Sequence, residues 1–181
     1  MNTTYQDIIS FWFSEITPKD WFKKSDTFDQ LIYQRFSTVY EAAIQNELYQ
    51  WRETAEGCLA EIIVLDQFSR NMFRDSPKAF EFDSLAVSLT QSAIIRELDH
   101  QLAVDKRKFL YMPLMHSESL LVHKQALQMF SQQGLEDNYD YEVRHRDIIK
   151  QFGRYPHRNK ILGRKSTKQE EAFLTQPGSS F

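Results

Sequence analysis

Apolar residues recur at helical spacing along most of the chain and predict helices. In the first segment, Tyr5, Ile8, Ile9 and Trp12 fall on one face when successive residues are placed about 100° apart. No segment shows the apolar and polar alternation of a convincing strand. The predicted helices cover residues 4–14, 26–45, 58–74, 77–97, 105–113, the segment from there to 133, 138–152 and 168–175. We therefore expect an all-α fold of about eight helices in one compact domain, residues 1–181.

Boundary residues support these limits. Ser25 is a typical N-cap, and Thr167-x-x-Glu170 is a capping box that opens the last helix. Gly57 precedes the helix over 58–74, and Gly153 ends the helix that begins at residue 138. Pro113 has no N–H to donate, so we expect it to end or kink its helix.

Composition narrows the class of protein. The chain has 41% hydrophobic and 26% charged residues with only five Gly and five Pro, which favours a soluble helical domain. The apolar run Ile62–Leu65 stops at Asp66, so no membrane span is expected. The N-terminal residues MNTTYQD show no secretory signal, and the one cysteine, Cys58, cannot form an internal disulfide. Together these features predict a cytoplasmic protein.

Charge is distributed unevenly. Residues 1–143 hold 13 Lys and Arg against 22 Asp and Glu, whereas residues 144–181 hold 9 against 3. A basic segment can bind nucleic acid, but the pI near 6.0 makes packing against the acidic body the favoured interpretation. Nucleic acid is therefore an unlikely partner.

The helix over 58–74 is apolar nearly all round, which is typical of a buried helix. Asp66 and Arg70 fall in the middle of one apolar face, at i and i+4, where they can form an ion pair. Asn71 and Arg74 flank this pair and extend the polar patch. Because burying two charges costs several kcal/mol per ion, Arg70 also becomes a candidate for contact with a ligand. A buried pair that only fixes helix register remains the alternative.

Histidines interrupt two further apolar faces. In the helix over 138–152, His145 lies at the centre of the apolar stripe, while Arg146 and Lys150 point towards solvent. That stripe consists of Tyr141, Ile148, Ile149 and Phe152. His116 and His123 are seven residues apart and share a face if the helix after Pro113 is regular. On such a helix Glu118 points away, so His116, Ser117 and Glu118 would not form one group. Each histidine is either a hydrogen-bonded core residue or part of a polar site.

Familiar catalytic and metal-binding motifs are missing from the sequence. There is no HExxH and no His pair at i and i+4, and the separated histidines give only a weak metal hypothesis. His145-Arg146-Asp147 matches the kinase catalytic-loop tripeptide, but the chain has no glycine-rich loop and no DFG. No GxSxG, P-loop or GxGxxG occurs. We assign no metal, no cofactor and no catalytic residue from these patterns.

Several long segments resemble a known family. These are FWFSE with WF nine residues on, LAEIIVLDQFSRNMFR, AFEFD, FLYMPLMHSES and HRDIIKQFGRYPHRNKILGR with STKQEEAFL. They resemble the bacterial domain-of-unknown-function family 924 over nearly the whole chain. The resemblance implies an all-helical fold similar to tetratricopeptide-repeat (TPR) superhelices, and it implies no activity. Ser69 replaces the proline expected after DQF, and Tyr155 replaces a phenylalanine before Pro-His-Arg-Asn.

Three functions fit these observations. The favoured hypothesis is a part-buried pocket for a small anionic molecule carrying phosphate or carboxylate, because guanidinium groups bind such oxyanions through paired donors. Its residues would be Asp66, Arg70, Asn71, Arg74, His116, His145, Arg154, His157, Arg158 and Asn159. One alternative is a TPR-like protein–protein adaptor. Another is an enzyme in which Asp66 assists His116 or His145 in acid–base chemistry. The oligomeric state cannot be derived from the sequence.

Overall fold

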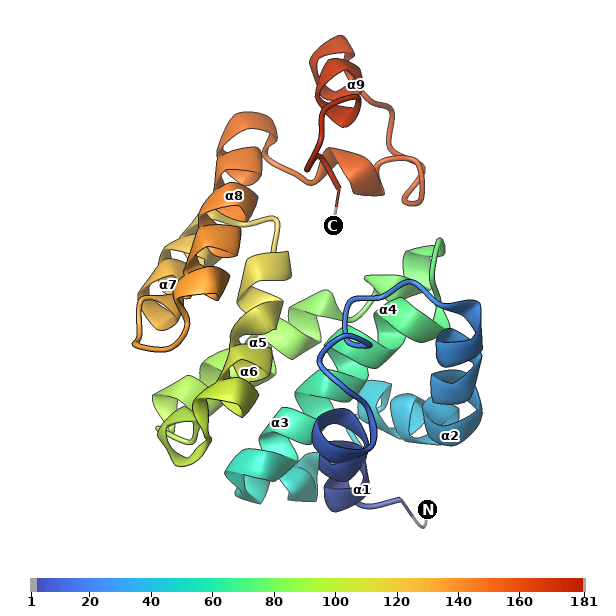
Figure 1. Cartoon of the computed structure of the whole chain (residues 1–181), viewed down its shortest axis with the longest axis vertical. Helices are drawn as coiled ribbons and strands as arrows, with labels where there is room; N and C mark the ends of the chain where they lie inside the picture. Colours follow the sequence, from blue (N-terminus) through green and yellow to red (C-terminus); the bar gives the residue numbers. More distant parts are fainter. Residues whose placement is uncertain (1–2, 181) are drawn as a thin grey trace.

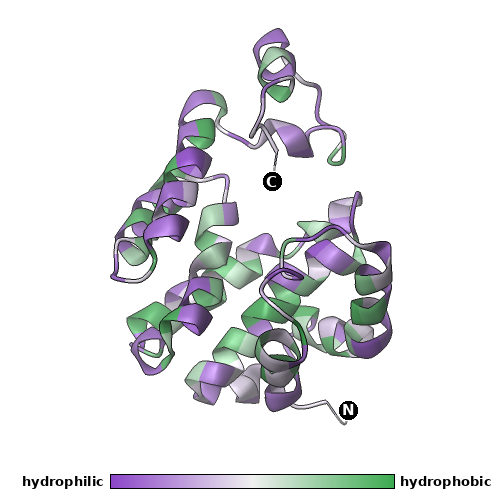
Figure 2. Ribbon diagram, viewed as in Figure 1, coloured by the Kyte–Doolittle hydropathy of each residue, from purple (hydrophilic) through white to green (hydrophobic). Residues whose placement is uncertain are grey.

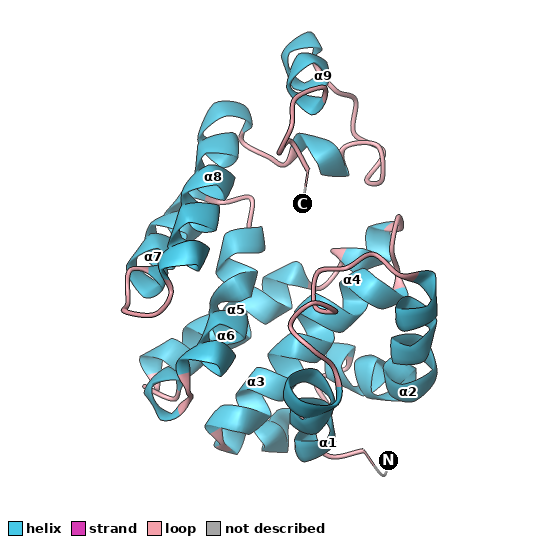
Figure 3. Ribbon diagram, in the orientation of Figure 1, coloured by secondary structure: helices cyan, strands magenta, loops and turns pink. Residues whose placement is uncertain are grey.

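The computed structural model describes residues 3–180, which form helices joined by short links with no β-strand among them (Figures 1 and 3). Their bounds are α1 Tyr5–Ser10, α2 Asp26–Ile44, α3 Ala55–Ile63, α4 Ser69–Met72, α5 Asp83–Ile95, α6 Val104–His116, α7 Leu120–Phe130, α8 Glu136–Phe152 and α9 Lys168–Leu174. The all-α fold class is confirmed. Residues 1–2, part of the N-terminal segment inspected for a secretory signal, and residue 181 lie outside the description. No described helix combines the length and apolar character needed to cross a bilayer.

α3 is the central element of the core. It packs against α1, α5 and α6, and the whole run from residue 57 to residue 69 is buried. Hydrophobic residues, green in the ribbon of Figure 2, gather where these helices meet. Burial on all sides explains why this segment is apolar nearly all round, as the sequence predicted.

The polypeptide does not remain a regular α-helix after α3. Residues Val64–Phe68 form a π-helical turn that leads directly into α4. The Ser69 hydroxyl lies 2.6 Å from the carbonyl oxygen of Leu65 and supplies a donor to this widened turn. One-turn π segments of this kind are frequent at functional sites, and this turn carries Asp66.

Several helix boundaries differ from the prediction. α3 begins at Ala55, because the Thr54 hydroxyl accepts a hydrogen bond from the Gly57 N–H at 3.0 Å, so Gly57 lies inside the helix. The helix predicted over 77–97 is interrupted: Pro77–Ala79 form a 3-10 turn and α5 begins at Asp83. α6 continues through Pro113, which removes only one backbone hydrogen bond, and the helix ends at His116.

The break after His116 changes the expected histidine geometry. Ser117–Ser119 are not helical and α7 starts at Leu120, so His116 and His123 do not share a helix face. The stripe predicted on α8 also needs correction, because Tyr141 is 54% exposed. His145, Ile148 and Ile149 are buried as expected.

The C-terminal segment, residues 153–180, closes one end of the molecule. Gly153 adopts a left-handed conformation (φ 69°) and ends α8, after which Pro156–Arg158 form a 3-10 turn. Figure 1 shows this segment and α9 at the end of α8, facing the α4 side of the molecule. Its position brings Arg158 towards residues that come from α4, α5 and α6. The finer expectation of TPR-like hairpins stays a prediction.

Candidate functional site

A cleft with a cavity of about 840 Å³ lies where α5, the link after α6 and the C-terminal segment approach one another. Its charged and polar lining includes His116, Ser117, Glu118 and Arg158. The remaining lining residues come from 77–88 and from residue 162, and they are Pro77, Lys78, Phe80, Glu81, Asp83, Ser84, Val87, Ser88 and Leu162.

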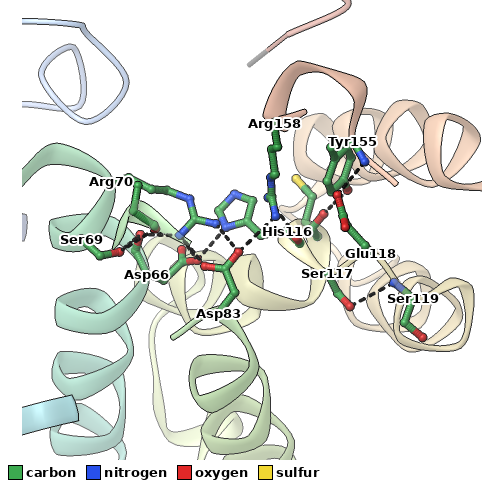
Figure 4. A network of polar contacts seen from close by, with 12 residues as sticks. Asp66, Ser69, Arg70, Asp83, His116, Ser117, Glu118, Ser119, Tyr155 and Arg158 are labelled. Atoms are coloured by element: carbon green, nitrogen blue, oxygen red, sulfur yellow. Dashed lines mark hydrogen bonds and ion pairs between the residues drawn. The ribbon is translucent and has the colours of Figure 1, made fainter. Parts of the chain in front are cut away.

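Asp66 lies beneath this cleft and is 1% exposed. Its Oδ1 atom is 2.7 Å from His116 Nδ1 and 3.0 Å from Arg70 Nη1 (Figure 4). Gln67 Nε2 donates to Oδ2 at 2.6 Å. Burial alone would raise the pKa of this carboxyl group, but the charge of Arg70 and the hydrogen bonds from His116 and Gln67 hold it well below its usual range. Asp66 is therefore an ionised carboxylate that only accepts hydrogen bonds.

His116 is the last residue of α6 and connects Asp66 to the cleft. Burial, followed by the repulsion of Arg70, lowers the pKa of this imidazole below 6.5, so the ring is neutral at pH 7. Since Asp66 accepts from Nδ1, the single ring proton lies on Nδ1 and leaves Nε2 unprotonated. Among the described residues, no hydrogen-bond partner occupies Nε2. The imidazole thus has the protonation state of a base.

Asp83 joins two guanidinium groups. Arg70 donates from Nη1 and Nη2 to both Asp83 oxygens at 2.9 Å, and Arg158 Nη1 lies 3.2 Å from Oδ2 (Figure 4). Arg158 Nη2 also donates to the His116 carbonyl at 3.0 Å. The positive charges of Arg70 and Arg158 are therefore held close together by one carboxylate.

Arg158 is 6% exposed and stacked between two rings. Its guanidinium carbon is 4.5 Å from the Phe80 centroid and 4.7 Å from the Tyr155 centroid, which fixes its orientation. Burial, and then the neighbouring Arg70, lower the pKa of Arg158. This guanidinium is positioned at the cleft but less fully neutralised than Arg70.

The structure brings Asp66, Arg70, His116 and Arg158 together. Asn71 and Arg74 lie elsewhere: both donate to Asp29 of α2, at 2.8 Å and at 2.6 and 2.8 Å, beside a second cavity of about 590 Å³. Helical spacing predicts both residues beside Arg70, but the preceding π turn and the contact with α2 determine their actual partners.

Arg154 and Asn159 contact other residues of the C-terminal segment and do not line the cleft. Arg154 pairs with Glu170 at 2.7 and 2.9 Å. Asn159 is buried and contacts Ser166 and Arg164. These contacts bind the chain after Gly153 to α9.

His145 and His157 surround Tyr155 behind the cleft. Their rings lie 5.9 and 5.6 Å from the Tyr155 ring, and neither histidine lines the cleft. Burial lowers the pKa of His145 to about 3 and that of His157 to about 4. Both rings are therefore neutral parts of the packing around Tyr155.

Sequence reasoning missed Asp83, Glu118 and Glu142. Glu118 accepts from the Tyr155 N–H at 2.7 Å and from Arg164 at 2.7 and 2.9 Å. On a regular helix Glu118 would point away from His116, but the link that carries Glu118 is not helical. Glu142 pairs with His123 and is buried. It lies one helical turn before Arg146, which is expected to point towards solvent, so helical spacing does not indicate that Glu142 is buried. Among residues 3–180, no group of three or more His, Cys, Asp and Glu side chains forms a candidate metal site.

Comparisons with known proteins agree with this fold. A family model described as a bacterial protein of unknown function, DUF924, matches residues 8–178. A solved structure described as a protein of unknown function, ATU0120 from Agrobacterium tumefaciens, is similar with a TM-score of 0.90 and 37% identity. That match covers 94% of this chain and 96% of the other. No curated protein matches the chain.

Proposed function

The chain belongs to the bacterial family DUF924, and we propose that its cleft binds a small anionic molecule through Arg158. The supporting observation is the position of this side chain, which is nearly buried, oriented by two rings and still part of the cleft lining. A guanidinium fixed in this way offers directed donors to a carboxylate or phosphate without first losing rotamer freedom.

Charge balance indicates which group would receive the anion. Arg70 takes both oxygens of Asp83 and one of Asp66, whereas Arg158 has a single 3.2 Å contact with Asp83. Because the two guanidinium groups repel each other, an anion beside Arg158 offsets a positive charge that Asp83 only partly neutralises. Arg70 would act indirectly, by occupying Asp83.

A thermal-shift titration tests this proposal. The probes are sodium acetate, sodium malonate and inorganic phosphate, at constant ionic strength set with sodium chloride. Ligand at about 100 times its Kd should stabilise the fold by about 2.7 kcal/mol, which corresponds to a rise in Tm of several degrees. The Tm of wild type should rise with at least one of these anions, and the Tm of Arg158→Gln should not.

The matched control is Arg144→Gln, which removes the same charge from the exposed face of α8. It should keep the wild-type response. An equal shift in Arg158→Gln, or no shift with any of the three anions in wild type, would contradict the proposal.

The Asp66–His116 contact favours a second candidate, an enzyme that uses acid–base chemistry, because it joins a histidine of the cleft to an ionised carboxylate at 2.7 Å. The adaptor alternative receives less support from the aromatic content. Many of the large rings are buried, including Phe11, Trp12, Phe36, Phe68, Phe109, Tyr111, Phe130 and Tyr155.

A further inference from the structure

We propose that the cleft hydrolyses esters of small carboxylic acids, with His116 as the general base and Asp66 as its positioning residue. This inference rests on the proposed function, since the carboxylate product would be the anion held by Arg158. The two ideas remain separable because binding of a carboxylate and cleavage of an ester are measured independently.

The first support is the fixed orientation of His116. Hydrogen bonds from Gln67 and His116 and an ion pair with Arg70 at 3.0 Å converge on the buried Asp66 carboxylate and hold it ionised. That carboxylate fixes the proton of His116 on Nδ1 and stabilises the imidazolium that forms when Nε2 takes a second proton. A histidine backed by an oriented carboxylate is the arrangement by which hydrolytic enzymes activate a nucleophile.

The second support is the balance of charges at the site, which determines how much additional negative charge (its charge capacity) the site can stabilise. Arg70 and Arg158 carry two positive charges, and Asp66 and Asp83 carry two negative charges, so these four side chains are neutral overall. One additional negative charge can be stabilised by Arg158, whereas the two charges of a phosphate monoester exceed what this guanidinium balances. A carboxylate, or the single negative charge that develops on an ester carbonyl during attack, fits this capacity.

The third support is the apolar side of the cleft. Phe80, Val87 and Leu162 line it together with His116 and Arg158. They can receive the hydrocarbon part of an acyl or alkyl group while the carbonyl oxygen faces the guanidinium, as in most small-molecule sites. Lys78 and Glu81 line the same cavity but are exposed, and they complete a polar rim.

The reaction consumes only water. His116 Nε2 takes a proton as the water oxygen forms a bond to the ester carbonyl carbon, and the carbonyl oxygen becomes an oxyanion that faces Arg158. The carbon–oxygen bond to the alcohol then breaks, and the imidazolium returns its proton to the leaving oxygen. The products are one carboxylic acid, which ionises in solution, and one alcohol.

The protonation of His116 predicts the pH dependence of hydrolysis. The groups around it are Asp66 and Arg70 from the segment between α3 and the end of α4, Asp83 from α5, His145 from α8, and His157 and Arg158 from the C-terminal segment. Burial and Arg70 outweigh the attraction of the two carboxylates and lower the pKa of the imidazole. The rate should therefore be constant from pH 7 to 8 and fall on the acid side with a midpoint below 6.5.

The direct test measures release of 4-nitrophenol from 4-nitrophenyl acetate, butyrate and hexanoate by the full-length protein. Wild type should hydrolyse at least one ester with saturation. His116→Gln should lower kcat/KM by about 10²-fold or more, which is the usual contribution of a general base. The matched control His100→Gln removes an exposed imidazole and should retain the wild-type rate.

Asp66→Asn distinguishes a positioning role from a structural one. The neutral amide no longer stabilises the imidazolium, so kcat should fall with KM little changed, and the acid midpoint should move to lower pH. A purely structural effect would not move this midpoint. If Asp66→Asn does not fold, carbethoxylation of wild type with diethyl pyrocarbonate replaces it: modification of His116, identified by mass spectrometry, should abolish hydrolysis, and hydroxylamine should restore it.

The outcomes separate the two proposals. If no ester is hydrolysed with saturation, or if His116→Gln retains the wild-type rate, ester hydrolysis is overturned. Acetate binding that still depends on Arg158 would leave the proposed function standing in that case. If wild type neither binds an anion nor hydrolyses an ester, both proposals are overturned.

Discussion

His123 Nδ1 lies 2.7 Å from Glu142 Oε1, and both side chains are fully excluded from solvent between α7 and α8. His123 Nε2 is 2.9 Å from the carbonyl oxygen of Ser117, so this nitrogen carries a proton that it donates to the link beside the cleft. Burial raises the pKa of Glu142, which shifts this carboxyl group towards its neutral form. The pair therefore connects α8 to the wall of the cleft through contacts at both ring nitrogens of His123.

Glu142→Gln should be tolerated, because its amide N–H can donate to His123 Nδ1 in place of the carboxyl proton. Glu142→Ala leaves an unsatisfied ring nitrogen and a void, and should lower the free energy of unfolding by about 2–4 kcal/mol. Urea unfolding at pH 7 measures both changes. If Glu142→Gln is as destabilising as Glu142→Ala, the contact is an ion pair rather than a neutral hydrogen bond.

The buried histidines should make the protein sensitive to acid. Burial lowers the pKa of His145 to about 3 and of His157 to about 4, from 6.5 in the unfolded chain. The unfolded chain therefore binds more protons than the folded protein. The contribution of the two neutral histidines to the free energy of unfolding is complete above pH 6.5 and is lost as the pH falls towards 4. Each such histidine contributes at most about 1.4 kcal/mol per pH unit to the slope of the free energy of unfolding against pH. His145→Gln should reduce this slope by about one such increment. The control variant His100→Gln removes an exposed imidazole and should leave the slope unchanged. If the slope is also unchanged in His145→Gln, His145 is not a neutral buried group.

Glu170 should control the attachment of the C-terminal segment. Its hydrogen bonds with Arg154, together with those of the capping box, lower its pKa to about 2. A lowered pKa in the folded state means that the contribution is present above pH 4.5 and is lost as the pH falls towards 2. Glu170→Gln should accelerate amide hydrogen exchange in α9 at pH 7, whereas Glu171→Gln, at an exposed neighbouring position, should not. Equal exchange in the two variants would contradict an anchoring role for Glu170.

Gly57 should not tolerate alanine, although alanine usually stabilises a helix interior by up to about 1 kcal/mol. An added Cβ would lie 1.9 Å from the carbonyl oxygen of Trp51. We expect Gly57→Ala to lower the free energy of unfolding by about 1–3 kcal/mol, as overpacking does. Gly153→Ala is the comparison: its Cβ would meet nothing within 4 Å, so its cost should be limited to left-handed strain of about 1–2 kcal/mol. Thermal or urea unfolding of both variants measures the difference, and a stabilised Gly57→Ala would mean that α3 begins after this residue.

Local relationships could be predicted because they depend on neighbours a few residues apart. The Asp66–Arg70 pair follows from i, i+4 spacing, and it forms at 3.0 Å even though a π turn carries Asp66. The Thr167–Glu170 capping box forms as expected, with Thr167 N donating to Glu170 at 2.7 Å. Steric and hydrogen-bonding rules within one or two turns are sufficient for such features.

Contacts between distant segments could not be predicted in this way. Helical spacing placed Asn71 and Arg74 beside Arg70, but α2 supplies Asp29 and holds both of them. Glu118 was assigned to the wrong side because its link is not helical, and Asp83 was not recognised as the partner of Arg70 and Arg158. Periodicity describes one helix at a time and contains no information on which helix faces it.

The sequence by itself determined the all-α class, the buried character of the segment around Asp66 and the inward direction of His145, because apolar periodicity and burial are linked through the hydrophobic effect. Only the tertiary structure decided that His116 meets Asp66 at 2.7 Å and that Arg158 reaches Asp83 across 75 residues. These contacts arise because α6 ends at His116 and the chain turns back after Gly153, and packing of whole helices sets both positions. The basic segment around Arg158 is thereby divided between surface charges, anchors of α9 and one guanidinium that lines the cleft.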